Sequence, residues 1–379
     1  MKFSGASSLV KCLGFEEGDK MIGFDIPSQE ARLLRETAER FMADRYTLEQ
    51  RGKILTDQTL VAKNWLAMAE LGWLAAPLPE SLGGLGLQPI QITGLLEVLG
   101  AGLVLEPVSA VMQCAVTLAR ALPEEKAIDR LNPILSGARI EVMAEGASGK
   151  PITARGDSET LYLAGMSPLV MGGSVASTFW VVVENDGVQA LCPVPATAAK
   201  VEHYRLLDGQ PVARVVFDGV TVRNADTITS AGAALRFGAD LGCVAILAES
   251  AGVIDALYCA TLDYVKLREQ FGRPIGRFQV VQHRMADMFI AREEARSMMQ
   301  LAAEAHDSED ESFRTRLISA ARVKIADNAR KVQRDAVQLH GGMGMTDELP
   351  VGHMVKRLLV LAQLGGNRQQ HLERFNAAA

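Results

Sequence analysis

The spacing of apolar residues changes twice along the 379-residue chain, and this limits the fold more than any other feature. Residues 21–139 carry apolar side chains at helical spacing, as in "LVAKNWLAMAEL". Residues 140–229 contain short runs rich in Val, Thr and aromatic side chains, such as "STFWVVVE", between Gly, Asn and Asp turns. Residues 230–379 return to helical spacing. The chain is therefore predicted to be α+β, with an N-terminal all-α domain, a middle β domain and a C-terminal helical domain.

The β domain is expected to be one small antiparallel sheet of about six to eight strands. The C-terminal domain has four long apolar-faced stretches, at residues 234–266, 278–306, 313–339 and 351–364, which predict an antiparallel four-helix bundle. Near its end, "RLLVLAQLGGNRQQHLERF" is helical on both sides of Gly365, Gly366 and Asn367. Because Gly disfavours a helix interior by about 1 kcal/mol relative to Ala, the helix is expected to break there.

The first twenty residues, "MKFSGASSLVKCLGFEEGDK", lack the continuous apolar run of a secretory signal. We expect the folded protein to start near Met21, with residues 1–20 as a disordered extension, so Met1 and Met21 both stay open as the true start. Ser28 can cap the first helix. No stretch reaches the roughly 18 to 20 uninterrupted apolar residues of a membrane span.

Composition and residue spacing limit the partners and metals that the chain is expected to bind. The net charge is −6 and there is no run of Lys and Arg, which argues against a nucleic-acid surface. The five cysteines are scattered and never spaced C-x-x-C, so we expect neither zinc nor disulfides, and a reducing cytoplasmic location. His283, His340 and His353 lack metal-ligand spacing, so no metal site is expected. The apolar share of 48% leaves room for subunit interfaces.

The first chemical motif is "DYVKLREQFGRPIGRFQVVQHRMADM", a helix, a turn and a second helix. The turn is expected to gather polar groups between two aromatic walls: Arg268, Gln270, Gln279, Gln282, Phe271 and Phe278. A guanidinium beside amides and rings suits a planar ligand that carries phosphate. The alternative is a plain joint between two helices with a surface arginine.

The second motif is "AVQLHGGMGMTDELPVGHMVKR", in which Gln338 precedes Gly341, Gly342 and Gly344. Glycines let backbone N–H groups approach a ligand closely. A structural turn between two bundle helices would explain the same residues, because a glycine-rich loop alone is weak evidence of phosphate binding.

Together, "R-x-Q-F-G-x-P-I-x-x-F-Q-x-x-Q" and the later "Q-x-H-G-G-x-G-(M/Y)-x-x-E" strongly resemble the acyl-CoA dehydrogenase family of flavoproteins. The segment "LGWLAAPLPESLGGLG" is similar to the N-terminal helix and loop of that family. The resemblance implies the same three domains assembled into tetramers, with FAD as the cofactor. It also implies removal of an α-proton from an acyl-CoA, transfer of the β-hydride to the flavin, and electron transfer to an electron-transferring flavoprotein.

In that family each FAD lies between two subunits, and the bundle of one chain contacts the diphosphate and adenosine of its neighbour's FAD. The resemblance places this role on nine positions, all compatible here: Arg268, Gln270, Phe271, Ile275, Phe278, Gln279, Gln338, Gly341 and Gly342. The flavin-ring side matches less well. Only fragments of the family pattern survive in "AEGASGKPITARGD" (144–157), and in "LVMGG" (169–173) Met171 replaces a hydroxyl residue. A thioether cannot donate the hydrogen bond that the hydroxyl would give.

The catalytic base is the missing element. The resemblance aligns the usual glutamate, in "Y-E-G-T", with Gly366 in "GGNR". A smaller group of relatives places the base on the first bundle helix, near Gly242. Asp240 and Glu249 are then the weak candidates for a displaced base, although both are compatible with ordinary helix carboxylates.

Three interpretations follow. The chain is an active homotetrameric dehydrogenase with a displaced base, or a binding or scaffold relative without catalysis, or a subunit whose paralogous partner carries the base and the flavin ring. The last interpretation explains best why the losses cluster at the ring and the base while the neighbour-serving positions remain. It resembles the small subunit of pimeloyl-CoA dehydrogenase-like or steroid side-chain heteromeric enzymes, in "YVKLREQFGRPIGRFQVVQHRMADM" and "QLHGGMGMTDELPVGHMVKRL". The acyl group itself is left open by the sequence.

Overall fold

The computed structural model describes residues 28–185 and 187–378, and the predicted disordered extension lies outside them. The N-terminal region is helical, as expected, with α2 (Gln29–Arg45), α3 (Leu48–Ile54), α4 (Gln58–Glu70), η1 (Glu80–Leu82), α5 (Pro89–Ala101), α6 (Val108–Ala121) and α7 (Glu124–Leu135). The predicted cap is confirmed, because the Ser28 hydroxyl accepts a hydrogen bond of 3.2 Å from the Ala31 N–H.

The middle region contains β1 (Glu141–Ala144), β2 (Thr153–Gly156), β3 (Thr160–Met171), β4 (Thr178–Asn185), β5 (Val188–Pro195), η2 (Ala196–Ala198), β6 (Lys200–Arg205), β7 (Pro211–Arg223) and η3 (Asn224–Asp226). The prediction of a single antiparallel sheet is wrong. The strands form two sheets, β1-β4-β5 and β2-β3-β7-β6, and β1 pairs with β4 in parallel. Strands β2 and β3 lie between β1 and β4 in the sequence, and such a long connection is what a parallel pair requires.

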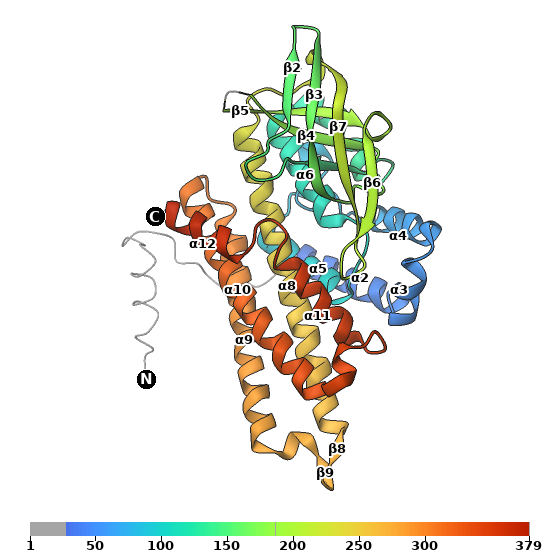
Figure 1. Ribbon diagram of the computed structural model, residues 1–379, viewed down its shortest axis with the longest axis vertical. Coiled ribbons are helices and arrows are strands. Elements are labelled where there is room, and N and C mark those ends of the chain that lie inside the picture. The colour runs from blue at the N-terminus through green and yellow to red at the C-terminus, as the bar shows by residue number, and fades with distance from the viewer. Residues whose placement is uncertain (1–27, 186, 379) are drawn as a thin grey trace.

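The predicted four-helix bundle is present. Its elements are α8 (Gly232–Leu267), β8 (Glu269–Gln270), β9 (Arg273–Pro274), η4 (Ile275–Arg277), α9 (Gln279–Ala305), α10 (Glu311–His340), η5 (Gly341–Met345) and α11 (Pro350–Leu361). The expected break follows α11, and α12 (Arg368–Ala377) then begins with Asn367 as its N-cap. Helix α8 runs from the β domain at one end of the molecule to β8 and β9 at the other (Figure 1).

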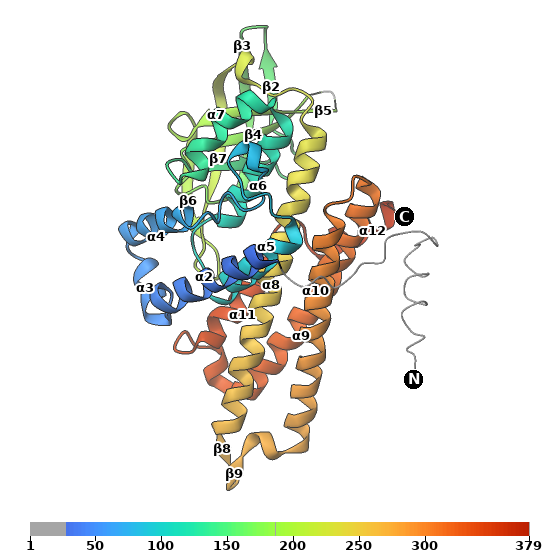
Figure 2. The ribbon, with the colours of Figure 1, turned by 180° about the vertical axis from the view of Figure 1, so that it is seen from behind.

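Helix α8 is long and apolar enough to cross a membrane by composition alone, with a mean hydropathy of 1.6 in its most apolar window. However, 67% of that window is buried inside the protein, as in the core helix of a bundle. The view from behind shows α5 crossing α8 near the middle of the molecule (Figure 2). The apolar character of α8 therefore reflects its packing against helices of two domains.

Two glycines allow α5 and α8 to cross with their backbones in contact. A Cβ added at Gly252 of α8 would lie 1.9 Å from the Glu97 carbonyl oxygen of α5. A Cβ added at Gly100 of α5 would lie 2.3 Å from the Glu249 carbonyl oxygen of α8. This crossing fixes where the preceding turns of α8 lie relative to the N-terminal domain, and so it positions the site described below.

Gly252→Ala is expected to destabilise the fold by about 3 kcal/mol, because the overlap with a backbone carbonyl cannot be relieved by a rotamer change. Denaturant unfolding of the purified chain measures this. Gly52→Ala is the matched control: a Cβ there meets no atom within 4 Å, so the variant should be unchanged or slightly more stable. Equal stability of Gly252→Ala and the wild type would contradict the proposed close crossing.

Candidate active site

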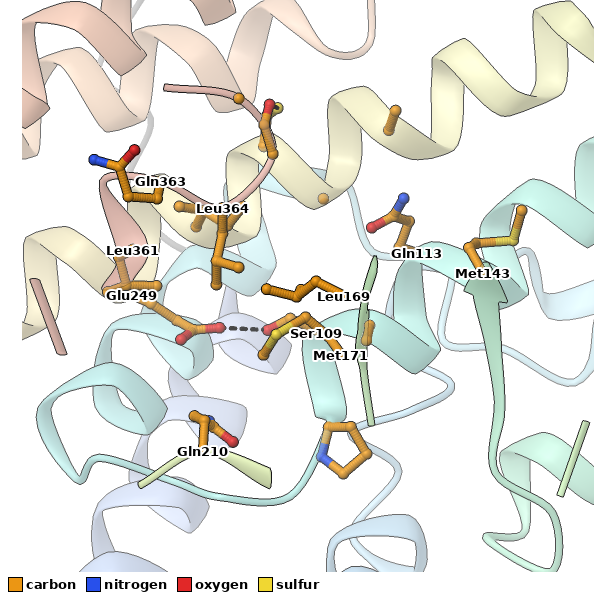
Figure 3. A pocket seen from close by; sticks show the side chains of 18 of the residues that line it. Ser109, Gln113, Met143, Leu169, Met171, Gln210, Glu249, Leu361, Gln363 and Leu364 are labelled. Carbon is orange, nitrogen blue, oxygen red and sulfur yellow. Dashed lines mark hydrogen bonds between the residues drawn. The ribbon is translucent and has the colours of Figure 1, made fainter. Parts of the chain in front are cut away.

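A cavity of about 460 Å³ lies where the three domains meet. Its walls come from the start of α6, from β1 and β3, from α8, and from the segment between α11 and α12. Figure 3 shows Leu169, Met171 and Leu364 meeting in the cavity, with Ser109 and Glu249 beside them. The lining combines apolar side chains with several polar and charged ones, and such a combination can bind and orient a small molecule.

Both positions at which relatives carry a base line this cavity, and both are glycines. Gly366 has a φ of +108°, a conformation that disfavours a side chain, and a Cβ added there would lie 3.2 Å from His371 Nε2. A Cβ added at Gly242 would lie 2.5 Å from Gln113 Oε1. No residue from 362 to 367 carries a carboxylate. A Cβ at either position would therefore crowd a neighbouring side chain, although both glycines also face the cavity.

A buried arginine fixes the loop that contains Gly366. Arg322 of α10 donates to the Gly366 carbonyl oxygen at 2.9 Å and to the Leu361 carbonyl oxygen at 3.3 Å, and also contacts the carbonyl of Leu364. His371 of α12 completes the arrangement, with Nε2 3.1 Å from the Gly365 carbonyl oxygen. Because these groups satisfy the carbonyls that α11 leaves unpaired at its end, the loop is rigidly positioned.

The structure separates the two carboxylates considered from sequence. Asp240 does not line the cavity; it accepts a hydrogen bond of 3.0 Å from Arg314. Burial raises its pKa, and the arginine opposes that shift. Glu249 does line the cavity, but its carboxylate is occupied by the Ser109 hydroxyl, at 2.6 Å, and by Arg357. An ion-paired carboxylate with both oxygens engaged is a poor proton acceptor.

Sequence reasoning missed a third carboxylate, Glu145, directly after β1. Glu145 lines the cavity and has neither an ion pair nor a side-chain hydrogen bond with any residue that the structure describes. Its side chain is exposed in the isolated chain, and partial desolvation by the surrounding atoms raises the pKa of the carboxyl, while Arg374 opposes the shift. Glu145 belongs to "AEGASGKPITARGD", the segment compared above with the flavin-contacting pattern of the family, where its carboxylate was not considered as a base.

The flavin-ring side of the cavity is apolar. Met143, Leu169 and Met171 line it, from β1 and β3. Met171 therefore faces the cavity from the strand on which we expected a hydroxyl residue to be replaced. Its thioether can pack against an aromatic ring but cannot donate a hydrogen bond to it.

The two sequence motifs meet at the opposite end of the bundle. The rings of Tyr264, one turn before Arg268, and of His340, two residues after Gln338, stack with centroids 4.3 Å apart. Beyond them, the β8–β9 hairpin exposes Phe271 almost completely, at 92%, against Phe278 with centroids 6.1 Å apart. The stack thus brings the two motifs together, as the resemblance implied.

The groups at this end fit a phosphate-bearing cofactor. The side chains of Arg268, Gln279 and Gln338 are exposed and have no hydrogen bond or ion pair with the described residues. A Cβ added at Gly341 or Gly342 would meet nothing within 4 Å, so the backbone there is open to a ligand. Exposed arginine and amide donors suit phosphate oxygens. Three further predicted positions lie in neighbouring elements: Gln270 in β8, Ile275 in η4 and Gly342 in η5. Their contacts with the cofactor stay predictions.

Within the described residues, no group of three or more His, Cys, Asp or Glu side chains could hold a metal ion.

Comparison with known proteins agrees with this arrangement. Residues 28–138 match the model "Acyl-CoA dehydrogenase, N-terminal domain", and residues 235–379 match "Acyl-CoA dehydrogenase, C-terminal domain". The chain belongs to the acyl-CoA dehydrogenase family, whose cofactor is FAD.

Three similar proteins show how the matches vary in sequence identity and coverage. A 3-sulfinopropanoyl-CoA desulfinase of Paraburkholderia xenovorans is 32% identical over 241 residues, which span 59% of this chain and 61% of that protein. Acyl-CoA dehydrogenase IpdE2 of Mycobacterium tuberculosis is 25% identical, over 93% of this chain and 98% of that protein. A chain of the ChsE4-ChsE5 complex of Mycobacterium tuberculosis superposes with a TM-score of 0.85 at 26% identity, covering 93% of this chain and 97% of that one.

Stability is expected to fall in acid because of His371. Burial, with the nearby charges of Arg322 and Arg374, lowers its pKa from 6.5 to about 4. In the unfolded chain, His371 therefore takes up a proton near pH 6.5, whereas in the folded chain it does so only near pH 4. The free energy of unfolding is therefore unaffected by the titration of His371 above pH 6.5. On the order of 3 kcal/mol of it is lost as the pH falls from 6.5 to about 4.

His371→Asn removes this contribution, so unfolding measured from pH 7 to pH 4 should show a shallower loss of stability than in the wild type. Other titrating groups, including buried His306, are present in both proteins and cancel in the comparison. Parallel pH profiles for the two proteins would contradict the buried, neutral state of His371.

Proposed function

We propose that this chain is a subunit of a flavin-dependent acyl-CoA dehydrogenase that relies on a paralogous partner for the catalytic base, within a cytoplasmic heterotetramer. The observation that carries the proposal is the pair of glycines at both base positions, closed in by Gln113 and His371. Neither position carries a side chain that could accept a proton, and a Cβ at either one would crowd a neighbouring side chain. Both observations support a chain that works without a glutamate at these positions.

The geometry of α8 supports an assembly. Gly242 lines the cavity and Leu267 ends the helix beside the predicted diphosphate site, 25 residues further on. At 1.5 Å per residue they lie roughly 38 Å apart, much further than one dinucleotide extends. The two sites of one chain therefore serve different FAD molecules, which requires a neighbouring chain.

Similarity to a heteromeric structure supports a paralogous neighbour. The ChsE4-ChsE5 complex contains two different chains by its name, and one of them matches this chain over nearly its whole length. Bound FAD would supply the hydride acceptor for the acyl group. The contribution of this chain is to bind: Arg268 and Gln338 would hold the phosphates of the partner's FAD, and the loop at Gly341 would offer backbone N–H groups.

Co-expression tests the proposal directly. Purified alone, the chain should contain little flavin and show no acyl-CoA dehydrogenase activity; co-purified from its host with a paralogous subunit, it should be yellow and active. Absorbance at the flavin maximum and the bleaching of that band by acyl-CoA are the measurements. A yellow homotetramer that turns over an acyl-CoA without any other subunit would disprove the partner requirement.

Within such a complex, Arg268→Ala should weaken FAD retention by about 1.5 to 3 kcal/mol, the worth of a charge-assisted hydrogen bond. The melting temperature of this subunit should stay unchanged, because the Arg268 side chain is exposed and unpaired within the described chain. Arg277→Ala, at an exposed arginine of the same turn outside the nine positions, is the matched control and should keep its flavin. Equal flavin loss in both variants would contradict the specific role of Arg268.

A second candidate, an active enzyme with a displaced base, is favoured by Glu145. It is an unpaired carboxylate in the cavity, and desolvation raises its pKa in the direction that makes a carboxylate more basic. Asp240 lies outside the cavity and Glu249 is ion-paired, so Glu145 replaces them as the candidate base.

Glu145→Gln then decides between the candidates. If Glu145 is the base, exchange of the α-proton of a CoA thioester with solvent deuterium should fall about 10²- to 10⁴-fold, with flavin content unchanged. Asp240→Asn is the matched control and should exchange at the wild-type rate. Unchanged exchange in Glu145→Gln would exclude the displaced base and leave the partner-supplied one.

A further inference from the structure

The end of the cavity away from Gly366 gathers several polar side chains. Ser109, Gln210, Glu249 and Arg357 all line it, from four different segments of the chain. Figure 3 shows the Ser109 hydroxyl directed at the Glu249 carboxylate, with Gln210 below them. Glu106 lines the same end.

One buried donor at this end has no partner within the described chain. Nε of Arg357 donates no hydrogen bond, although both terminal nitrogens of its guanidinium are paired. Arg357 is only 5% exposed. The Glu106 carboxyl, in contrast, is engaged by Tyr46 and by the Asn64 side chain. Buried polar atoms in native proteins nearly always have a partner, so the Arg357 donor indicates a missing bound acceptor.

The polar end lies at a defined distance from the base positions. Gly242 and Glu249 both line the cavity from α8 and are seven residues apart. At 1.5 Å of rise per residue this separation is roughly 10 Å, which an extended chain of about eight carbon–carbon bonds spans. An acyl group whose α carbon lies beside Gly242 and Gly366 therefore reaches the polar end with its far carbon.

Charge at this end favours a neutral group. The Arg357 guanidinium is already shared between Glu249 and Asp208, at 2.9 Å from the latter. Among the described residues that line this end, Arg357 is the one cation, and it is already ion-paired, so nothing there balances the charge of a carboxylate ligand. A hydroxyl or carbonyl oxygen can accept a hydrogen bond from Nε of Arg357 without adding charge.

We infer that this cavity selects acyl groups that carry a neutral oxygen, as a hydroxyl or carbonyl, about 10 Å from the α carbon. The inference rests on the proposed function in one respect: it takes the ligand to be a CoA thioester. It is tested by measuring ligand binding, whereas the partner requirement is tested by flavin content and activity, so the two can fail independently.

Calorimetric titration of the full chain, co-purified with its partner subunit where needed, compares three probes of equal length: decanoyl-CoA, 10-hydroxydecanoyl-CoA and decanedioyl-CoA. The hydroxylated probe should bind about tenfold tighter than decanoyl-CoA, the gain from one well-made hydrogen bond. Decanedioyl-CoA should bind more weakly than the hydroxylated probe. Equal or tighter binding of decanoyl-CoA, tightest binding of decanedioyl-CoA, or binding of none would overturn the inference.

A triple variant, Asp208→Asn/Glu249→Leu/Arg357→Met, locates the selectivity. It replaces the buried cation together with both of its anionic partners, so no buried charge is left unpaired, and it should abolish the preference for the hydroxyl. The matched control is Asp240→Leu/Arg314→Met, a pair that also joins α8 to another element but lies outside the cavity. It should keep the preference. Melting curves check both variants, and the comparison of probes on the wild type holds even if a variant fails to fold.

Discussion

A buried arginine, Arg357 of α11, connects all three domains, and the shape of the cavity depends on it. Its guanidinium pairs with Asp208 of the β domain at 2.9 Å and with Glu249 of α8. Glu249 in turn accepts from Ser109 of α6, and Arg51 of α3 donates to the Asp208 carbonyl at 2.7 Å. Breaking a buried pair leaves an uncompensated charge, so the domains cannot separate here without a large penalty.

This arrangement also explains why the chemistry cannot depend on Glu249. The residue is needed as a structural anion between two domains, and the close crossing at Gly100 holds its backbone in place. The loop at Gly366 is fixed in a similar way, by the Arg322 cation and by carbonyl contacts. Both sides of the cavity are rigid, and neither offers a free carboxylate. The proposed dehydrogenation therefore needs its proton acceptor from Glu145 or from another chain.

The sequence predicts the elements well because their causes are local. Helical spacing, the Ser28 cap and the glycine break before Asn367 each act within a few residues. The parallel pairing of β1 with β4 was missed because it joins strands separated by a hairpin, and strand propensity does not specify partners. The cavity was missed for the same reason: Glu249 and Arg357 are 108 residues apart, and neither residue alone signals an ion pair. The cofactor positions were accessible only through the motifs, since Arg268 and Gln338 converge through the Tyr264–His340 stack.

The division between the two ends of the bundle has a physical origin. A site for an acyl chain must exclude water, and here burial between three domains supplies that environment. A site for phosphates needs exposed donors, and the tip of the bundle supplies them on a hairpin where Phe271 projects into solvent. Exposing an aromatic ring so fully is unfavourable for an isolated chain, because apolar area stays in water. In the proposed assembly a neighbouring chain and its FAD cover that ring, so the residues proposed to bind the partner's cofactor would also promote assembly.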